Sequence, residues 1–327
     1  MTPLIEAVPN VSEGRRREVV ERLVRAAGGG SGRRLLDCSS DPSHNRTVLT
    51  LVGDREGLLA ALLALYEVAT DAIDLRTHRG EHPRVGAVDV VPFVALDGVS
   101  TGDCVALART LGRTVAERFG IPVFLYEDAA TRPERRALEE IRRGQLDGLA
   151  ERMAREPDAW RPDFGPRAPH ATAGVSVVGA RPILIAFNVN LDTDDVRIAR
   201  RIARTVRASN GGLPHVKAIG VHLAERGAAQ VSMNLTDYTQ TPLHHAFEAV
   251  EREAGRLGVR VAGSEVVGLV PAAALIESAV SRLRLDRFRP AQLLDVRTGS
   301  PLDTQRSLAS SNPRSSVMNS ETSRKCR

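Results

Sequence analysis

The sequence predicts a mixed α/β (α+β) protein made of two similar halves, each with the element order βαββαβ. Short runs rich in Val, Ile and Leu alternate with longer segments whose apolar residues recur at helical spacing, which is typical of sheets covered by helices. This alternation occurs twice, on either side of residues 160–172, a segment with three prolines and the only tryptophan. The length of 327 residues and the 42% hydrophobic content are sufficient for two domains.

In the first half, short apolar runs predict strands at residues 4–8, 35–38, 47–52, 85–96 and 122–126. Helical periodicity predicts helices at residues 15–27, 57–73, 101–119 and 132–155. Ser12 stands before the first of these helices, and serine is a residue type that commonly caps helix N-termini. The segment 160–172 that follows is either an interdomain linker or a loop that lines a cleft between the halves, where ligands often bind.

In the second half, the predicted strands are residues 173–178, 183–189, 216–223, 230–235 and 259–267, and the predicted helices are 192–208 and 243–257. The helix 192–208 starts with acidic residues, which stabilise a helix N-terminus. From Arg297 onward the chain is rich in Ser, Arg, Asn and Thr, which predicts disorder. The predicted organisation is therefore an N-terminal subdomain at 1–180, a C-terminal subdomain at 181–296 and a disordered tail at 297–327.

The charge composition points to a small anionic ligand. The formal net charge is +5, with 45 basic and 40 acidic residues that are well interspersed, so no block of charge indicates a nucleic-acid-binding arm. Sheets of the βαββαβ type can bind RNA, but that use needs aromatic side chains for base stacking. Only 3% of the residues are aromatic. We therefore expect neither a nucleic-acid partner nor RNA binding.

The sequence also indicates a soluble protein of a reducing compartment. The three cysteines are scattered and include no CxxC pair, which argues against a disulfide framework and a structural zinc site. The N-terminus lacks the basic start and apolar stretch of a signal peptide. No apolar run approaches the roughly 20 residues that span a bilayer. We therefore expect a cytoplasmic protein without a membrane partner.

One loop places several polar side chains together between two glycines. Residues 79–84 read Arg-Gly-Glu-His-Pro-Arg, and another glycine follows shortly before an apolar run. Gly80 and Pro83 disfavour a helix, so we predict a shaped loop. The apolar run 85–96 predicts a buried strand that anchors this loop. Loops on rigid elements often carry catalytic groups, and His82 suits acid–base chemistry near neutral pH.

Three other polar clusters are predicted beside strand ends, at residues 10–13, 41–46 and 234–237. Arginine binds carboxylates through paired hydrogen bonds, so Arg46 and Arg84 are candidates for holding substrate carboxylates. The candidates for orienting the histidine are Glu81, Asp41 and Asp89. As a set, these clusters predict a cleft for a polyanionic substrate.

Other classes of site find less support. His78 and His82 are four residues apart, a spacing that binds metal when both rings lie on one helix face. Gly80 and Pro83 oppose a helix there, so no metal is predicted. No GxGxxG or GxxxxGK[ST] motif follows a predicted strand, which disfavours a dinucleotide or P-loop enzyme. The chain also lacks the GxSxG motif of serine hydrolases.

Seven motifs occur between Pro3 and about Arg289: residues 8–14 (VPNVSEG), 44–48 (HNRTV), 79–90 (RGEHPRVGAVDV), 162–166 (PDFGP), 185–190 (IAFNVN), 230–235 (QVSMNL) and 267–271 (VGLVP). In content and order they resemble the glutamate formiminotransferase (formimidoyltransferase) family. Relatives in animals often carry a fused cyclodeaminase. The chain is too short to hold one, so we expect the stand-alone form.

The resemblance implies a one-carbon transferase that moves the formimino group of N-formimino-L-glutamate to N5 of tetrahydrofolate in histidine degradation. The products are then 5-formimidoyltetrahydrofolate and L-glutamate. Tetrahydrofolate is the implied co-substrate, without a metal. The resemblance further implies two ferredoxin-like subdomains with folate in a cleft between them, and a homodimer. The alternative is a folate-binding relative of the same fold that uses a formyl donor or has no catalytic activity.

The resemblance also transfers individual site residues. His82 matches the family's catalytic histidine, acting as general base and then acid. Supporting roles are expected for Asp41, Asn45, Arg46, Glu81, Arg84 and Asn234. Ser39 stands where some relatives carry an acidic residue, and Asp41 is the candidate for that role. The folate-binding loop corresponds to Gly165, Pro166, Arg167, Ala168, Pro169, His170, Ala171, Thr172, Ala173 and Gly174.

Overall fold

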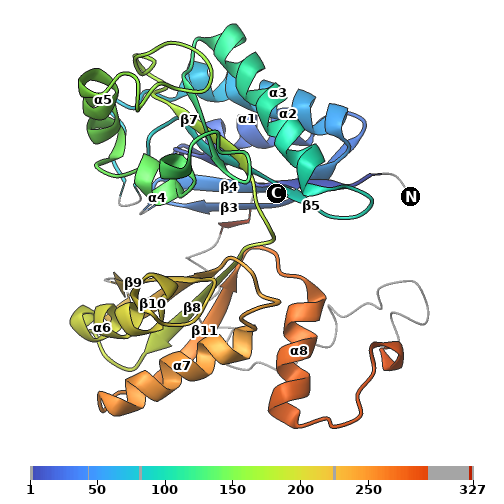
Figure 1. Cartoon of the computed structure of the whole chain (residues 1–327), viewed down its shortest axis with the longest axis vertical. Coiled ribbons are helices and arrows are strands. Elements are labelled where there is room, and N and C mark those ends of the chain that lie inside the picture. The colour runs from blue at the N-terminus through green and yellow to red at the C-terminus, as the bar shows by residue number, and fades with distance from the viewer. Residues whose placement is uncertain (1–2, 43, 81–82, 224–225, 294–323, 326–327) are drawn as a thin grey trace. The chain divides into compact units, whose positions relative to one another are not determined.

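A computed structural model describes residues 3–42, 44–80, 83–223, 226–293 and 324–325. The chain divides into two compact units, Met1–Arg181 together with Asn319–Arg327, and Pro182–Met318. Each unit contains a sheet packed with helices, which confirms the predicted mixed α/β class (Figure 1). Within the described ranges, the helices are too short or too polar to cross a membrane.

The first unit contains most of the strands and helices predicted for the first half. Its elements are β1 (Ile5–Ala7), β2 (Asn10–Val11), α1 (Arg17–Gly28), β3 (Arg33–Asp41), β4 (Arg46–Gly53), α2 (Arg55–Ala72), β5 (Val88–Ala95), α3 (Thr101–Phe119), β6 (Val123–Glu127), α4 (Leu138–Ile141), α5 (Gln145–Arg155) and β7 (Ser176–Ala180). The edge strand β12 (Arg324–Lys325) pairs with β3.

The described strands of this sheet follow the order β12-β3-β4-β1-β5-β7-β6. β1 and β2 act as one interrupted strand, because both pair with β4 and β5. The interruption falls at Val8 and Pro9, and a proline cannot donate to a strand ladder. β7 pairs parallel with both β5 and β6, whereas the pairs among β1, β3, β4 and β5 are antiparallel.

Helices cover both faces of the first sheet, but not equally (Figure 1). Helices α1, α2 and α3 pack on one face over a large apolar core that includes Leu62 and Phe93, both fully buried. Helices α4 and α5 cover the other face over β5, β6 and β7, where Leu149 packs near Phe124. Each such side chain contributes about 1.5–3 kcal/mol by leaving water. This packing makes the sheet a rigid base for the loops at its ends.

Three expectations about the residues of the first unit need correction. The predicted helix 132–155 is divided into a 3-10 turn, α4 and α5. Ala137 is extended before α4, and Gly144 adopts a left-handed conformation with a φ of 74° before α5. The predicted strand 173–178 appears as β7 and belongs to the first sheet rather than to the second half. The segment 160–172 lies inside the first unit and pairs with Val123, so it is not an interdomain linker.

The second unit repeats the order of elements. It contains β8 (Ile185–Leu191), α6 (Val196–Val206), β9 (Val216–Leu223), β10 (Ala228–Leu235), α7 (Leu243–Arg256), β11 (Val261–Val267) and α8 (Ala272–Leu283). Its described strands follow the antiparallel order β11-β8-β10-β9. This matches β5-β1-β4-β3 of the first unit, which confirms the predicted repetition.

The second sheet has one apolar and one polar face. Val189 and Val231 belong to the core that α6 and α7 cover. Because side chains alternate along a strand, Asn190 and Gln230 lie on the opposite face, where the amide of Gln230 donates to Asn190 Oδ1 over 2.8 Å. The sequence motifs 185–190 and 230–235 therefore alternate between the apolar core and the opposite face of the sheet, where Asn188 and Gln230 are also buried.

Two further predictions concern the ends of elements. Helix α6 begins at Val196 rather than at residue 192, and the carboxylate of Asp195 caps it by accepting the N–H of Arg197. Helix α8 follows the last predicted strand and was not anticipated. The predicted disordered tail at 297–327 lies outside the described residues, apart from Arg324–Lys325.

Candidate active site

The β2–α1 turn, the β3–β4 hairpin and the segment before β5 meet at one end of the first sheet. Ser12 joins the β2–α1 turn to the segment before β5. Its N–H donates to the carbonyl of Ala87 over 2.8 Å, and its hydroxyl donates to the carbonyl of Gly86 over 2.7 Å. The predicted role of Ser12 as a helix cap is therefore wrong, because its hydroxyl is used in this tertiary contact.

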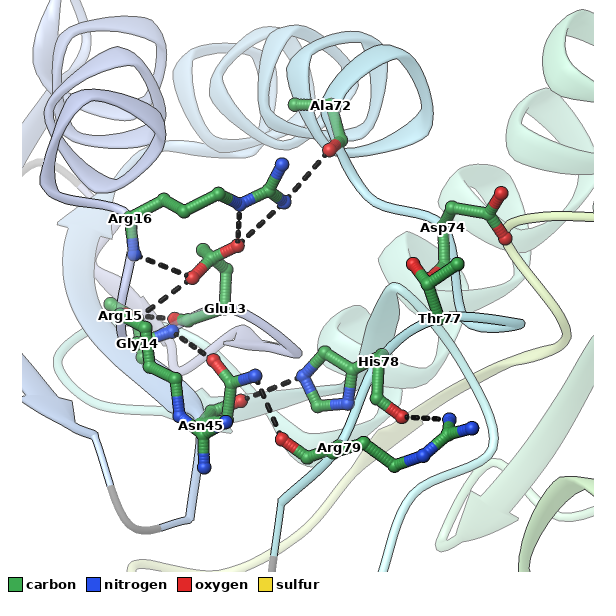
Figure 2. Close-up of polar contacts among 11 residues, drawn as sticks. Glu13, Gly14, Arg15, Arg16, Asn45, Ala72, Asp74, Thr77, His78 and Arg79 are labelled. Atoms are coloured by element: carbon green, nitrogen blue, oxygen red, sulfur yellow. Dashed lines mark hydrogen bonds and ion pairs between the residues drawn. The ribbon is translucent and has the colours of Figure 1, made fainter.

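Glu13 takes the place of the expected cap at the start of α1. Its carboxylate accepts the N–H groups of Arg15 and Arg16, each over 2.9 Å, and pairs with the Arg16 guanidinium (Figure 2). Burial alone raises the pKa of this carboxyl group. The backbone amides of Arg16 and Arg15 and the Arg16 side chain outweigh burial, so the net pKa is lowered. Glu13 is therefore an ionised anchor for the β2–α1 turn.

Replacing Glu13 with glutamine is expected to lower thermal stability at neutral pH, because the ionised form makes these hydrogen bonds. A lowered folded-state pKa adds stability above the unfolded value of about 4.3. That stability disappears as the pH falls through the folded-state pKa. Melting temperatures measured from pH 7 to pH 3 should therefore converge for the wild type and Glu13→Gln. The control is Glu21→Gln, which alters an exposed α1 glutamate and should give a smaller gap at pH 7.

Asn45 is the centre of the hydrogen bonds at this end of the sheet (Figure 2). Its side-chain oxygen accepts the N–H of Gly14 over 2.9 Å, and its side-chain amide donates to the carbonyl of Arg79 over 2.9 Å. Its own carbonyl oxygen lies 3.1 Å from Nε2 of His78. Its φ of 50° is left-handed, a conformation that asparagine tolerates better than most residues. Asn45 thus joins the hairpin to both neighbouring segments.

The glycines that bracket the polar loop are explained by close backbone contacts. A Cβ atom at Gly80 would collide with the carbonyl oxygen of His44, and one at Gly86 would collide with the carbonyl oxygen of Val175. The loop therefore approaches the β3–β4 hairpin on one side and the strand leading to β7 on the other. Any larger residue would push these segments apart.

The structure gathers three of the predicted supporting residues around one small cavity. This cavity of about 10 Å³ is lined by Ser12, His44, Asn45, Arg46, Arg84 and Asp89. Burial lowers the pKa of Arg46 to about 10, with a further contribution from the charge of Arg142. Burial likewise lowers the pKa of Arg84. Arg46, Arg84 and Arg142 thus lie near the carboxylate of Asp89. The cavity itself has about the volume that one water molecule needs, so it is too small to hold a substrate.

Both oxygens of Asp89, one of the candidates for orienting His82, have partners among the described residues. One of its oxygens accepts the N–H of Val85 over 2.8 Å, and the other pairs with the Arg142 guanidinium of the segment after α4. Both side chains of this pair are largely buried. Asp89 therefore fixes the start of β5 and holds Arg142 near the cavity.

The other predicted residues lie in different places. Asp41 is at the end of β3, where its oxygens contact the N–H and the ring Nδ1 of His44. Asn234 is exposed on β10 of the second unit. Glu81 and His82 lie outside the described residues, so their predicted roles stay predictions.

The predicted folate-binding segment, residues 165–174, begins beside β6 and ends at the base of the polar loop. Its first four residues are exposed. Near its end, the carbonyl of Thr172 accepts the N–H of Leu75 over 2.9 Å, and Gly174 forms an isolated bridge with Gly86. The structure thus places the end of this segment next to the strand that follows His82 in the sequence.

Sequence reasoning missed two features of this site. His78 was considered only as a metal ligand, although it is buried and bonded to the hairpin. Arg142 comes from a region 53 residues after its partner Asp89, which no local motif could reveal. Among the described residues, no group of three or more His, Cys, Asp or Glu side chains could hold a metal ion.

Both units match models of known protein families. Residues 4–181 match the N-terminal subdomain of the formiminotransferase domain, and residues 186–287 match the formiminotransferase domain. A glutamate formimidoyltransferase of Streptococcus pyogenes serotype M1 is 48% identical over 288 residues, which cover 88% of this chain and 96% of the relative. One from Thermoplasma acidophilum is 45% identical, covering 89% and 96%.

A fused relative shows a different coverage. The formimidoyltransferase-cyclodeaminase of Rattus norvegicus is 43% identical over 85% of this chain but over only 52% of its own length. The two units together therefore correspond to a formiminotransferase domain. The chain belongs to the formiminotransferase family, as its seven motifs implied.

Proposed function

We propose that this chain transfers the formimino group from N-formimino-L-glutamate to N5 of tetrahydrofolate, giving 5-formimidoyltetrahydrofolate and L-glutamate. The observation that carries this proposal is the 48% identity to a glutamate formimidoyltransferase over nearly the whole of both chains. The reaction belongs to folate-dependent one-carbon metabolism and to histidine degradation. Its substrates carry carboxylates, a group that arginine side chains pair with.

His82 is the proposed acid–base group. N5 of tetrahydrofolate attacks the formimino carbon and forms the new N–C bond, while the C=N electron pair moves onto the imine nitrogen. His82 removes the N5 proton. The electron pair on the imine nitrogen then re-forms the C=N bond as the bond between carbon and the glutamate nitrogen breaks. The imidazolium protonates that leaving nitrogen, as one well-placed group can.

Neighbouring residues hold the substrates in this proposal. Arg46 and Arg84 bind carboxylates, since guanidinium groups pair with them through two parallel hydrogen bonds. Asn45 keeps the hairpin and the polar loop together. Residues 165–174 bind folate, and Asp41, Glu81 and Asn234 have supporting roles. Alignment of the reacting groups supplies much of the rate enhancement.

The remaining features of the proposal concern organisation. The repeated strand order supports ferredoxin-like subdomains at 1–180 and 181–296. The folate cleft between them is proposed from the family resemblance alone. We further propose a cytoplasmic homodimer that uses tetrahydrofolate as co-substrate and requires no metal.

A paired assay tests the reaction. Purified protein with tetrahydrofolate is offered formiminoglutamate or formylglutamate in separate reactions, and product formation is followed by mass spectrometry. We expect 5-formimidoyltetrahydrofolate from the first donor only. Transfer from formylglutamate alone, or folate binding without transfer from either donor, would contradict the proposed reaction. Absence of folate binding would contradict the folate site as well.

A further inference from the structure

His78 is the buried histidine closest in sequence to His82, and its surroundings give it a defined task. It follows the turn after α2, where its N–H donates to the carbonyl of Asp74 over 3.1 Å. Only 7% of its surface is exposed. Its ring reaches the carbonyl of Asn45 on the β3–β4 hairpin, with Nε2 3.1 Å from that oxygen (Figure 2).

The hydrogen bonds of the ring define its protonation state. A carbonyl oxygen only accepts, so Nε2 of His78 must carry the hydrogen. The other ring nitrogen, Nδ1, is buried and has no partner among the described residues. A proton on Nδ1 would be a buried donor without an acceptor, which costs about 1–3 kcal/mol. The ring is therefore neutral, with its single hydrogen directed at Asn45.

The charges around the ring favour the same state. Burial lowers the pKa of His78, and the guanidinium of Arg84 lowers it further. The hydrogen bond to Asn45 and the carboxylate of Glu13 act in the opposite direction, and Arg15 adds to the lowering. The net effect is a lowered pKa, which favours the neutral ring.

The backbone of His78 closes the polar loop. Its carbonyl oxygen accepts hydrogen bonds from Nη2 of Arg84 over 3.0 Å and from Nη1 of Arg79 over 2.9 Å. Arg84 also donates to the carbonyl of Gly80 over 3.2 Å. One arginine thus joins the two ends of the segment that contains Glu81 and His82. His78 in turn fastens those ends to the hairpin through its ring.

We propose that His78 is a positioning residue for the transfer reaction: as a neutral imidazole bonded to Asn45, it holds both ends of the His82 loop on the β3–β4 hairpin. This inference rests on the proposed function, which assigns the acid–base step to His82. A displacement of about 1 Å of a reacting group can cost about 10² in rate. Loss of the ring donor should therefore lower kcat more than it weakens substrate binding.

The test compares two substitutions that differ in the ring donor. His78→Leu replaces the ring with an apolar side chain of similar size and so removes the donor. We expect kcat to fall about 10–100-fold. KM for either substrate should change by less than about threefold. His78→Gln places an amide N–H where Nε2 stood, so it should retain most of the wild-type kcat.

His244 offers a matched control in the second unit. It is also buried, its Nδ1 also has no partner among the described residues, and burial lowers its pKa too. His244→Leu should leave kcat near the wild-type value, even where it lowers the melting temperature as much as His78→Leu does. A similar loss of kcat in both variants would show only a general effect of stability and would overturn the proposal.

Hydrogen exchange adds a readout that does not depend on activity. Without substrates, the backbone amides of Arg79, Gly80 and residues 84–86 should exchange faster in His78→Leu than in the wild type, and at the wild-type rate in His78→Gln. If the wild type transfers no formimino group, the proposed function fails, whereas the exchange result still tests the anchoring. If the wild type is active but His78→Leu keeps both its kcat and its exchange rates, the positioning role is wrong.

Discussion

Replacing His82 with alanine is expected to reduce the rate of formimino transfer by about 10²–10⁴-fold, the usual contribution of a general acid–base group. The affinity for tetrahydrofolate should change much less, because the side chain acts on the proton of N5 rather than on the bulk of the folate. Steady-state kinetics with both substrates, together with tetrahydrofolate binding by calorimetry, measures the two effects separately.

The matched control for this prediction is His245→Ala. His245 is an exposed histidine on α7 of the second unit and is not among the predicted site residues. It should keep the wild-type rate. If His82→Ala turned over at the wild-type rate as well, the catalytic assignment of His82 would be wrong, even though family membership would stand.

The fold could be predicted from the sequence to the extent that local patterns determine it. The buried strand β5 and the long helix α2 follow directly from apolar runs of the appropriate length. The repeated βαββαβ order was visible for the same reason. The 3-10 turn, α4 and α5 were merged into one predicted helix because residues 132–155 are charged throughout. That pattern does not indicate where the backbone turns, for example at Gly144, which has a φ of 74°.

The site was predictable where chemistry and spacing coincide in one short motif. Arg46 and Arg84 were identified from the sequence and line one cavity in the structure. The role of Ser12 was misread, because the pattern of a serine before a helix is local while its acceptor, Gly86, is 74 residues away. Pairings such as Asp89 with Arg142 depend on tertiary packing that a single sequence does not encode in any local pattern.

A buried ion pair within the first unit gives the largest expected effect on stability. Asp163 and Arg135 have side chains that are 6% and 2% exposed, with Oδ1 3.2 Å from Nη2. The other oxygen of Asp163 accepts the N–H of Leu125 over 2.8 Å, and Arg135 also donates to the carbonyl of Arg161 over 2.6 Å. This pair therefore fixes the entry to the predicted folate-binding segment.

Replacing Asp163 with asparagine is expected to destabilise the first unit by about 3–5 kcal/mol, because the guanidinium of Arg135 remains buried without its counter-charge. Adding Arg135→Met should recover part of this loss, since the double variant buries no unpaired charge.

Trp160 is the only tryptophan and lies in the same unit, so its fluorescence during urea unfolding reports on this unit alone. The control, Asp128→Asn, breaks the more exposed pair with Arg136 and should cost about 1 kcal/mol or less. Equal urea midpoints for Asp163→Asn and Asp128→Asn would mean that breaking the buried pair costs no more stability than breaking the exposed one. The start of the folate-binding segment would then be held mainly by its backbone hydrogen bonds to β6.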